Sequence, residues 1–206
     1  MAEPDRHVVL LGDSILDNGA YTDGGPDVTA QLRAHVPCTL AARDGSVVAD
    51  VPGQLARAPD AATHLVISAG GNDALRYEHV LAAPAASVAA ALALLGEVAG
   101  HFRAQYGVML DAVTRRALPT AVCTIYDPRF PEPERQRLAV AGLALFNDAI
   151  IREAFARGLA VIDLRLICAE PGDLANPIEP SSRGGVKIAA AIARFATAPA
   201  GLRVLP

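Results

Sequence analysis

A serine, a glycine and an asparagine each follow the end of an aliphatic run in this sequence, within a few residues of it. They are Ser14 in "VVLLGDS", Gly45 in "LAARDG" and Asn72 in "VISAGGN". A serine hydroxyl is a potential nucleophile, and a glycine amide and an asparagine side chain can stabilise the oxyanion that forms at an attacked acyl group. Taken singly, each motif is typical of an ordinary turn. Their positions after three successive runs favour acyl-group chemistry.

The aliphatic runs predict β-strands that are covered on both faces, because they lack alternation of polar and apolar residues. The predicted strands are His7–Leu11, Cys38–Ala42, His64–Ser68, Thr120–Ile125 and Leu159–Asp163. Helical patterns lie between and after them, at Asp27–His35, Val48–Arg57, about Pro84–Leu118, Pro133–Arg157 and from about Ser181 onward. This alternation predicts one domain, residues 1–206, with helices on both faces of a parallel sheet. The carboxyl ends of its strands would bring Ser14, Gly45 and Asn72 to one edge.

Composition narrows the class of protein. The 206 residues are 52% hydrophobic and carry a net charge of −4, which is typical of a globular chain and gives no basic surface for nucleic acid. The Ala/Leu-rich stretch Ala82–Gly100 predicts a buried helix and no membrane span. "MAEPDRH" lacks the features of a secretory leader, so a cytoplasmic location is expected. The three cysteines, Cys38, Cys123 and Cys168, are expected to be reduced core thiols.

Three of these segments resemble conserved blocks of the GDSL, or SGNH, hydrolases, a family of serine esterases and lipases. "LLGDSILDN", "DGS" and "GGND" are similar to the first, second and third blocks. The resemblance implies a flavodoxin-like three-layer α/β/α sandwich with a five-stranded parallel sheet. It also implies Ser14 as nucleophile, with the Ser14 amide, Gly45 and Asn72 as oxyanion donors. A small-molecule ester would be the substrate, with no cofactor and no metal.

The fourth block departs from the family pattern D-x-x-H. "NPIEPSS" places Asn176 at the aspartate position and Glu179 at the histidine position. We expect the Asn176 NH₂ group to donate to the Glu179 carboxylate, and Glu179 to act as the base for Ser14. An ordinary glutamate pKa of about 4.3, lowered further by Asn176, would make this base weak. None of the histidines is expected to replace it: His7, His35, His64, His79 and His101.

Other polar residues at the same edge have simpler expected roles. We expect Asp13, Asp17 and Asp73 to cap loop amides. The proline-rich loop "YDPRFPEPE" is predicted to form a wall of the substrate site, with Tyr126 and Phe130 lining it.

Three functions remain open from the sequence. The first is a hydrolase that cleaves a small ester through an acyl-Ser14 intermediate. The second is a catalytically impaired protein of this fold that binds a ligand or partner, which the loss of both Asp and His favours. The third is an O-acyltransferase that uses the same serine. The sequence does not determine the oligomeric state.

Overall fold

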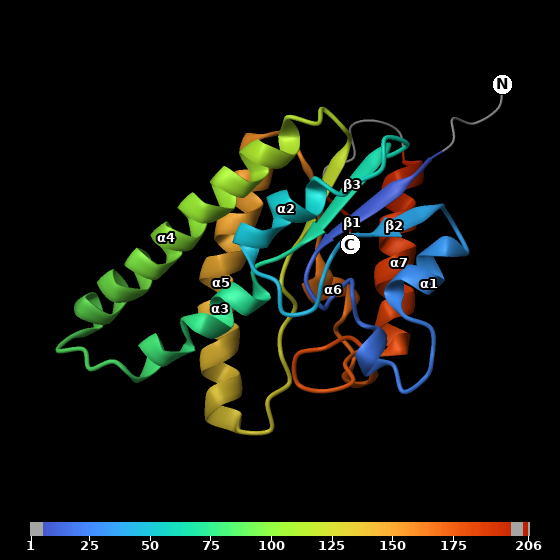
Figure 1. The fold of residues 1–206 in the computed structure, drawn as a ribbon. Coiled ribbons are helices and arrows are strands. Elements are labelled where there is room, and N and C mark those ends of the chain that lie inside the picture. The colour runs from blue at the N-terminus through green and yellow to red at the C-terminus, as the bar shows by residue number, and fades with distance from the viewer. Residues whose placement is uncertain (1–5, 199–203, 206) are drawn as a thin grey trace.

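Parallel strands form a single sheet in the order β2-β1-β3-β4-β5-β6. The computed structural model describes residues 6–198 and 204–205 (Figure 1). The strands are β1 (Val8–Gly12), β2 (Cys38–Leu40), β3 (His64–Ser68), β4 (Thr120–Cys123), β5 (Ala160–Ile162) and β6 (Val204–Leu205). The five predicted strands are thus confirmed, but the sheet has a sixth strand. Two residues that pair with β5 are too short a run to show a strand pattern in the sequence.

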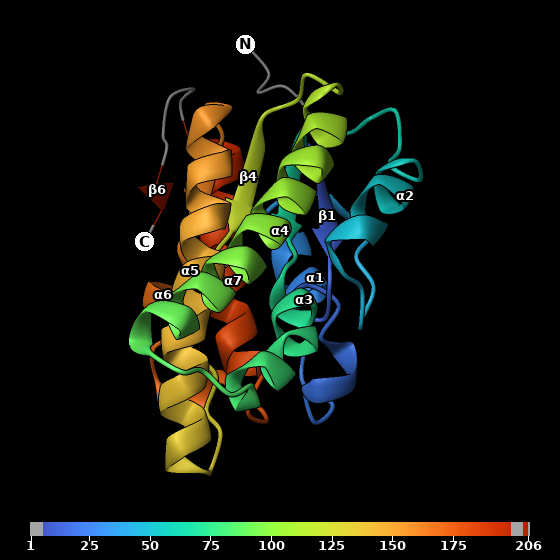
Figure 2. The same ribbon diagram turned by 90° about the vertical axis from the view of Figure 1, so that its left-hand side faces the viewer.

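Two helical layers cover this sheet. The longer helices are α1 (Val28–Arg33), α2 (Val51–Leu55), α3 (Gly71–Arg76), α4 (Val88–Thr114), α5 (Pro133–Ala156), α6 (Leu164–Ile167) and α7 (Ser182–Thr197). Short 3₁₀ turns are η1 (Gly19–Tyr21), η2 (Val48–Asp50), η3 (Glu78–Ala82) and η4 (Pro171–Asp173). Helices α1, α6 and α7 pack on one face, and α2, α4 and α5 on the other (Figures 1 and 2). The three-layer α/β/α sandwich is therefore confirmed.

The core explains why the strands carry no polar alternation. In β1, Val8 and Leu10 point into one hydrophobic cluster, whereas Val9 and Leu11 point into the other. Both faces of the strand therefore need apolar side chains. The three cysteines are buried and free, as predicted.

Two glycines allow the chain to turn sharply where β1 and β3 end. Gly12 and Gly70 both have φ of +123°, a region that other residues rarely adopt. A Cβ atom at Gly12 would lie 1.7 Å from the carbonyl oxygen of Ser68, so only glycine fits there. The segments with Ser14 and Asn72 leave the sheet directly after these two positions.

The prediction of a buried helix over residues 82–100 is wrong for its first part. Helix α4 extends beyond the sheet, as Figures 1 and 2 show. Val88 and Leu92 are 78% and 63% exposed, and burial begins at Val98. An alanine-rich composition gives high mean hydropathy whether or not another element lies opposite, so the sequence does not reveal where packing starts. Among the residues described, no helix has the length and apolarity to cross a bilayer.

Candidate active site

Ser14 lies in a tight turn at the carboxyl end of β1. The Asp13 amide donates to the carbonyl oxygen of Ser68 (3.0 Å), and the amides of Leu16 and Asp17 both donate to the carbonyl oxygen of Asp13 (3.1 Å each). These bonds fix the backbone on both sides of the serine. Ser14 is only 6% exposed.

Glu179 is the hydrogen-bond partner of the serine hydroxyl. Ser14 Oγ donates to Glu179 Oε1 over 3.1 Å, although 165 positions separate the two residues in the chain. The loop 174–180 that carries Glu179 is closed by an antiparallel bridge between Leu174 and Pro180 and by a bond from the Ala175 amide to the Glu179 carbonyl oxygen (2.9 Å). The structure therefore joins these two of the predicted site residues directly.

Asn176 has a different role from the one that we expected. Its Oδ1 atom accepts hydrogen bonds from the amides of Ile178 and Glu179, both over 2.9 Å. The side chain thus closes the turn before Glu179 and does not donate to its carboxylate. The second carboxylate oxygen, Glu179 Oε2, is buried without a hydrogen-bond partner within the part of the chain described. In this Asx turn the Asn176 side chain provides a hydrogen-bond acceptor for two main-chain amides at once. This arrangement is favoured over a single hydrogen bond to the Glu179 carboxylate.

The expected lowering of the Glu179 pKa is also wrong. Burial raises the pKa of Glu179 to about 7, the Ser14 hydrogen bond opposes this rise, and the charge of Asp44 adds to it. The carboxyl group is removed from water, and no ion pair to it is found among residues 6–198, so its charged form is disfavoured. Burial likewise raises the pKa of the neighbouring Asp13 to about 8, with a further contribution from Glu179.

Asn72 lines the same cavity as Ser14 and is bonded to the loop that contains Gly45. Asn72 Nδ2 donates to the carbonyl oxygen of Ser46 over 2.9 Å, which ties α3 to the loop that contains Gly45. Gly45 has φ of +76°. Within residues 6–198 no hydrogen bond from the amides of Ser14 or Gly45 is found.

Two buried amide side chains that the sequence analysis did not single out hold this site together. Gln54 of α2 accepts from the Gly12 amide (2.6 Å), and its Nε2 donates to the Gly12 carbonyl oxygen (2.8 Å) and to Ser46 Oγ (3.1 Å). Asn18 donates to the carbonyl oxygen of Pro180 (3.0 Å), the residue after Glu179. Both residues connect segments that are distant in the sequence.

The acidic residues at this edge cap loop amides, as predicted. Asp13 accepts from the Ile15 amide (3.2 Å), Asp17 from the Asp44 amide (3.0 Å) and Asp73 from the Val48 amide (3.0 Å). In the described residues, no group of three or more His, Cys, Asp or Glu side chains has the geometry to hold a metal ion.

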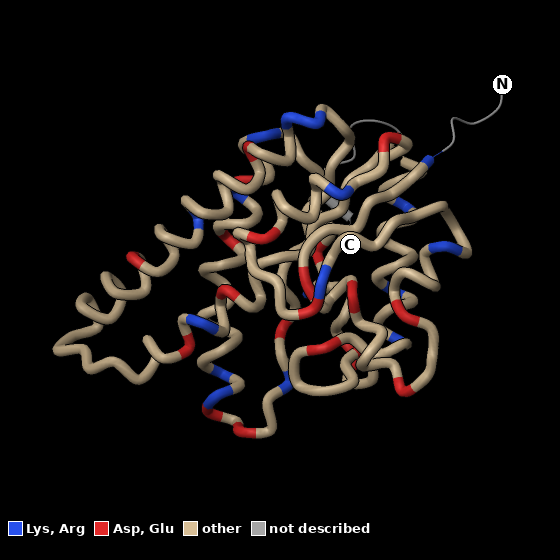
Figure 3. The backbone as a smooth tube through the Cα atoms, in the orientation of Figure 1, with Lys and Arg blue, Asp and Glu red and all other residues tan. Residues whose placement is uncertain are grey.

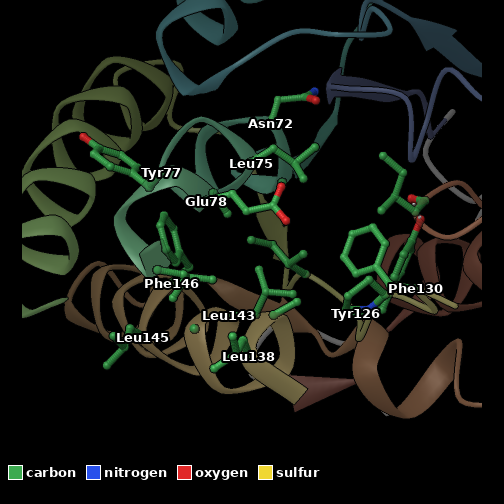
Figure 4. Close-up of a pocket in the computed structure, with 18 of the residues that line it drawn as sticks. Asn72, Leu75, Tyr77, Glu78, Tyr126, Phe130, Leu138, Leu143, Leu145 and Phe146 are labelled. Carbon is green, nitrogen blue, oxygen red and sulfur yellow. Dashed lines mark hydrogen bonds between the residues drawn. The ribbon is translucent and has the colours of Figure 1, made fainter. Parts of the chain in front are cut away.

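A largely apolar cavity begins at Ser14 and runs between α3, η3, α4 and α5. Its lining includes Tyr126 and Phe130, so the predicted wall of the site is present. The Tyr126 hydroxyl also donates to the carbonyl oxygen of Ile178 (2.7 Å), next to Glu179. Figure 4 shows Tyr126 and Phe130 at one end of the cavity, and Tyr77 and Phe146 toward the other.

The three-layer fold and a buried serine between a carboxyl group and amide donors define the class of SGNH-type α/β proteins. The model of the GDSL-like lipase/acylhydrolase family matches residues 10–185, and the chain belongs to this family. No curated protein sequence matches the chain.

Solved structures with the same fold include enzymes with different substrates. The extracellular lipase from Streptomyces rimosus is 19% identical, with a TM-score of 0.65 over 88% of this chain and 95% of the lipase. Phospholipase A1 from Streptomyces albidoflavus is 16% identical, with a TM-score of 0.66 over 90% and 98% of the two chains. An acetylxylan esterase from Geobacillus stearothermophilus is 16% identical, with a TM-score of 0.60 over 94% and 95%.

Proposed function

We propose that this protein hydrolyses a carboxylic ester through an acyl-Ser14 intermediate, with Glu179 as the general base. The observation that carries the proposal is the 3.1 Å hydrogen bond from Ser14 Oγ to a carboxylate whose pKa burial raises to about 7. A base is most effective when its pKa lies near the working pH. Membership of the GDSL-like lipase/acylhydrolase family supports the same class of reaction.

In the first half of the reaction, Ser14 Oγ attacks the ester carbonyl carbon while its proton passes to Glu179 Oε1. The carbonyl oxygen becomes an oxyanion, which the amides of Ser14 and Gly45 and the side chain of Asn72 would bind. When the tetrahedral intermediate collapses, the bond to the alcohol oxygen breaks. Glu179 then returns the proton to that oxygen, and the alcohol leaves.

The second half repeats these steps with water. Glu179 takes a proton from a water molecule, whose oxygen attacks the acyl carbon of the acyl-enzyme. The bond between this carbon and Ser14 Oγ breaks, and the serine recovers its proton from Glu179. The fixed geometry of the Glu179 loop, closed by Asn176 and Tyr126, favours such a repeated transfer. No resident cofactor takes part in this scheme.

A fluorophosphonate probe tests the proposal, because it reacts with an activated serine whatever the natural substrate of the enzyme is. We expect stoichiometric labelling of the wild-type protein at pH 8, none of Ser14→Ala, and at least hundredfold slower labelling of Glu179→Gln. Heat-unfolded protein serves as the control for nonspecific reaction. Equal labelling of Glu179→Gln would rule out Glu179 as the base.

The two alternatives predict other outcomes. A protein of this fold that only binds a ligand would leave Ser14 unlabelled, and the variant Asn176→Asp/Glu179→His would then test whether an Asp–His pair restores reactivity. An O-acyltransferase would be labelled, but it would convert most of the acyl group into a new ester when an acceptor alcohol is added. Product analysis with and without the alcohol distinguishes it from a hydrolase.

A further inference from the structure

The cavity beside Ser14 has one polar end and one apolar end. Polar lining side chains gather at the first end, where Asp13, Ser14, Asn72 and Glu179 lie. Beyond them the lining is almost entirely aliphatic and aromatic, and includes Leu75, Val98, Leu143 and Phe146. Such a surface offers few hydrogen-bond partners to a sugar, whereas an aliphatic chain would be stabilised by leaving water.

Glu78 is the one lining residue with a charge away from the serine end, and this charge is neutralised. Arg135 of α5 donates to both of its carboxylate oxygens, over 2.6 and 3.1 Å. The same guanidinium lies 3.8 Å from the centre of the Phe130 ring. The ion pair thus joins η3 to α5, the two walls of the cavity.

A polar pair, Tyr21 and Asp44, lies outside the lining of the cavity, and the Asp44 amide donates to Asp17 Oδ2, three residues after Ser14, over 3.0 Å. The Tyr21 hydroxyl donates to Asp44 Oδ2 over 2.7 Å, and the charge of Asp44 acts on Glu179. Neither Tyr21 nor Asp44 lines the apolar cavity. An ester held at Ser14 would thus have an apolar surface inside the cavity and this polar, acidic pair outside it.

We infer that the cavity binds the acyl chain of the substrate, and that this chain is a linear aliphatic one with about four methylene groups or more. The cavity volume is about 120 Å³, and a group of the size of a water molecule or a methylene group occupies about 30 Å³, so about four such groups fit. This inference rests on the proposed function and specifies its substrate. A substrate with a long aliphatic acyl chain would distinguish this protein from an esterase that acts on acetylated sugars.

Two pairs of esters test the assignment to the acyl side. Methyl octanoate should be hydrolysed with a kcat/KM about two orders of magnitude above that of methyl acetate, because the cavity holds about four of its six additional methylene groups and each buried methylene contributes about threefold. Octyl acetate carries the same chain on the alcohol and should gain less than tenfold over methyl acetate. An equal or larger gain for octyl acetate would overturn the assignment.

Gly142 offers a way to fill the cavity without disturbing the fold. It lies on the face of α5 that also carries the lining residues Leu138 and Phe146, and a Cβ atom there meets nothing within 4 Å. Gly142→Leu should lower kcat/KM for methyl octanoate at least tenfold more than it lowers kcat/KM for methyl acetate. Leucine also favours the helix over glycine, so the variant should fold.

Gly96→Leu is the matched control. Gly96 is also a glycine within a helix, its Cβ position is equally open, and it is exposed and does not line the cavity. This variant should hydrolyse both esters like the wild type. If both variants lose octanoate activity equally, or neither does, the cavity is not the acyl site.

A binding experiment separates this inference from the proposed function. Methyl octanoate should raise the melting temperature of Ser14→Ala, methyl acetate at the same concentration should not, and Ser14→Ala/Gly142→Leu should show no shift. If the wild type cleaves no ester but these shifts occur, hydrolysis is wrong and the chain-binding site stands. If acetate is cleaved but no variant distinguishes chain length in binding or rate, the chain-binding site is wrong and hydrolysis stands.

Discussion

A carboxylate that removes a proton from serine near neutral pH must be a stronger base than an exposed glutamate. The environment of Glu179 achieves this by burial, with one carboxylate oxygen bonded to Ser14 and the other without a partner among the described residues. The usual histidine reaches the same range of pKa without help from the fold. In the proposed mechanism, a glutamate in place of the family's histidine would transfer the control of basicity from the residue type to its surroundings.

The activity should depend on pH in one direction. The base must be unprotonated, and the pKa of Glu179 is raised to about 7. We therefore expect kcat/KM to rise about tenfold per pH unit below 7 and to level off above it. A profile with methyl octanoate between pH 5 and 9 measures this. Constant activity from pH 5 upward would contradict a base with a raised pKa.

Stability should depend on pH in the opposite direction. The folded-state pKa of Glu179 is about 7 against an ordinary value of 4.5, so its protonated form is favoured by folding. This contribution is complete below pH 4.5 and is lost as the pH rises through 7. The wild type should thus lose on the order of 1–2 kcal/mol of unfolding free energy relative to Glu179→Gln between pH 5 and pH 8.

Urea unfolding of both proteins at the two pH values measures this difference. Asp13, whose pKa is also raised, is present in both proteins, so the comparison isolates Glu179 and its interaction with Asp13. An unchanged difference between pH 5 and pH 8 would mean that Glu179 is ionised at both.

At the scale of elements, Gln54 connects helix α2 to the turn of Ser14 and to the loop of Gly45. Gln54→Leu would leave the Gly12 amide and carbonyl groups buried without these partners, which costs about 1–3 kcal/mol of stability. The Ser14 turn and the Gly45 loop would lose their common support. We expect kcat to fall at least tenfold, with a smaller change in KM, in steady-state kinetics.

Gln136→Leu is a matched control for this prediction. Gln136 also bonds to two main-chain groups, the Phe130 amide and the Pro128 carbonyl oxygen, but these lie in the loop that forms a wall of the cavity and not in the Ser14 turn or the Gly45 loop. Gln136→Leu should reduce stability, but it should lower kcat for methyl acetate less than Gln54→Leu does. If the two variants reduce kcat equally, Gln54 has no special role in positioning the site.

The strands and the meeting of Ser14, Gly45 and Asn72 were predictable, because aliphatic runs and parallel topology determine them. The pairing of Ser14 with Glu179 followed from the family frame. The roles of Asn176 and Gln54 were not predictable, since an amide side chain can donate and accept, and their partners are main-chain groups that leave no pattern in the sequence. The basicity of Glu179 depends on burial by distant segments, which residue type alone does not reveal.

For the whole molecule, the buried thiols should report on global unfolding. Burial raises the pKa of Cys38, Cys123 and Cys168, which lie far apart in the chain but are all in the same core cluster. The thiolate is the reactive form. We therefore expect negligible reaction with a disulfide reagent at pH 8, and simultaneous reaction of all three in denaturant, followed by mass spectrometry. Early reaction of one thiol would indicate local opening.

The first turns of α4 have a further consequence for the motion of the molecule. Residues 80–96 carry no acidic or basic side chain, and this uncharged stretch is visible in Figure 3 at the outer end of the helix. Its side chains are mostly exposed up to Leu95, whereas Phe102, Tyr106 and Leu110 are fully buried.

Helical hydrogen bonds without tertiary packing open frequently. Amide protons of residues 88–95 should therefore exchange with deuterated water orders of magnitude faster than those of residues 102–110. Because Leu95 also lines the cavity, an occupying aliphatic chain would slow this exchange. The rate of amide exchange in this wall of the cavity would then depend on whether the cavity is filled.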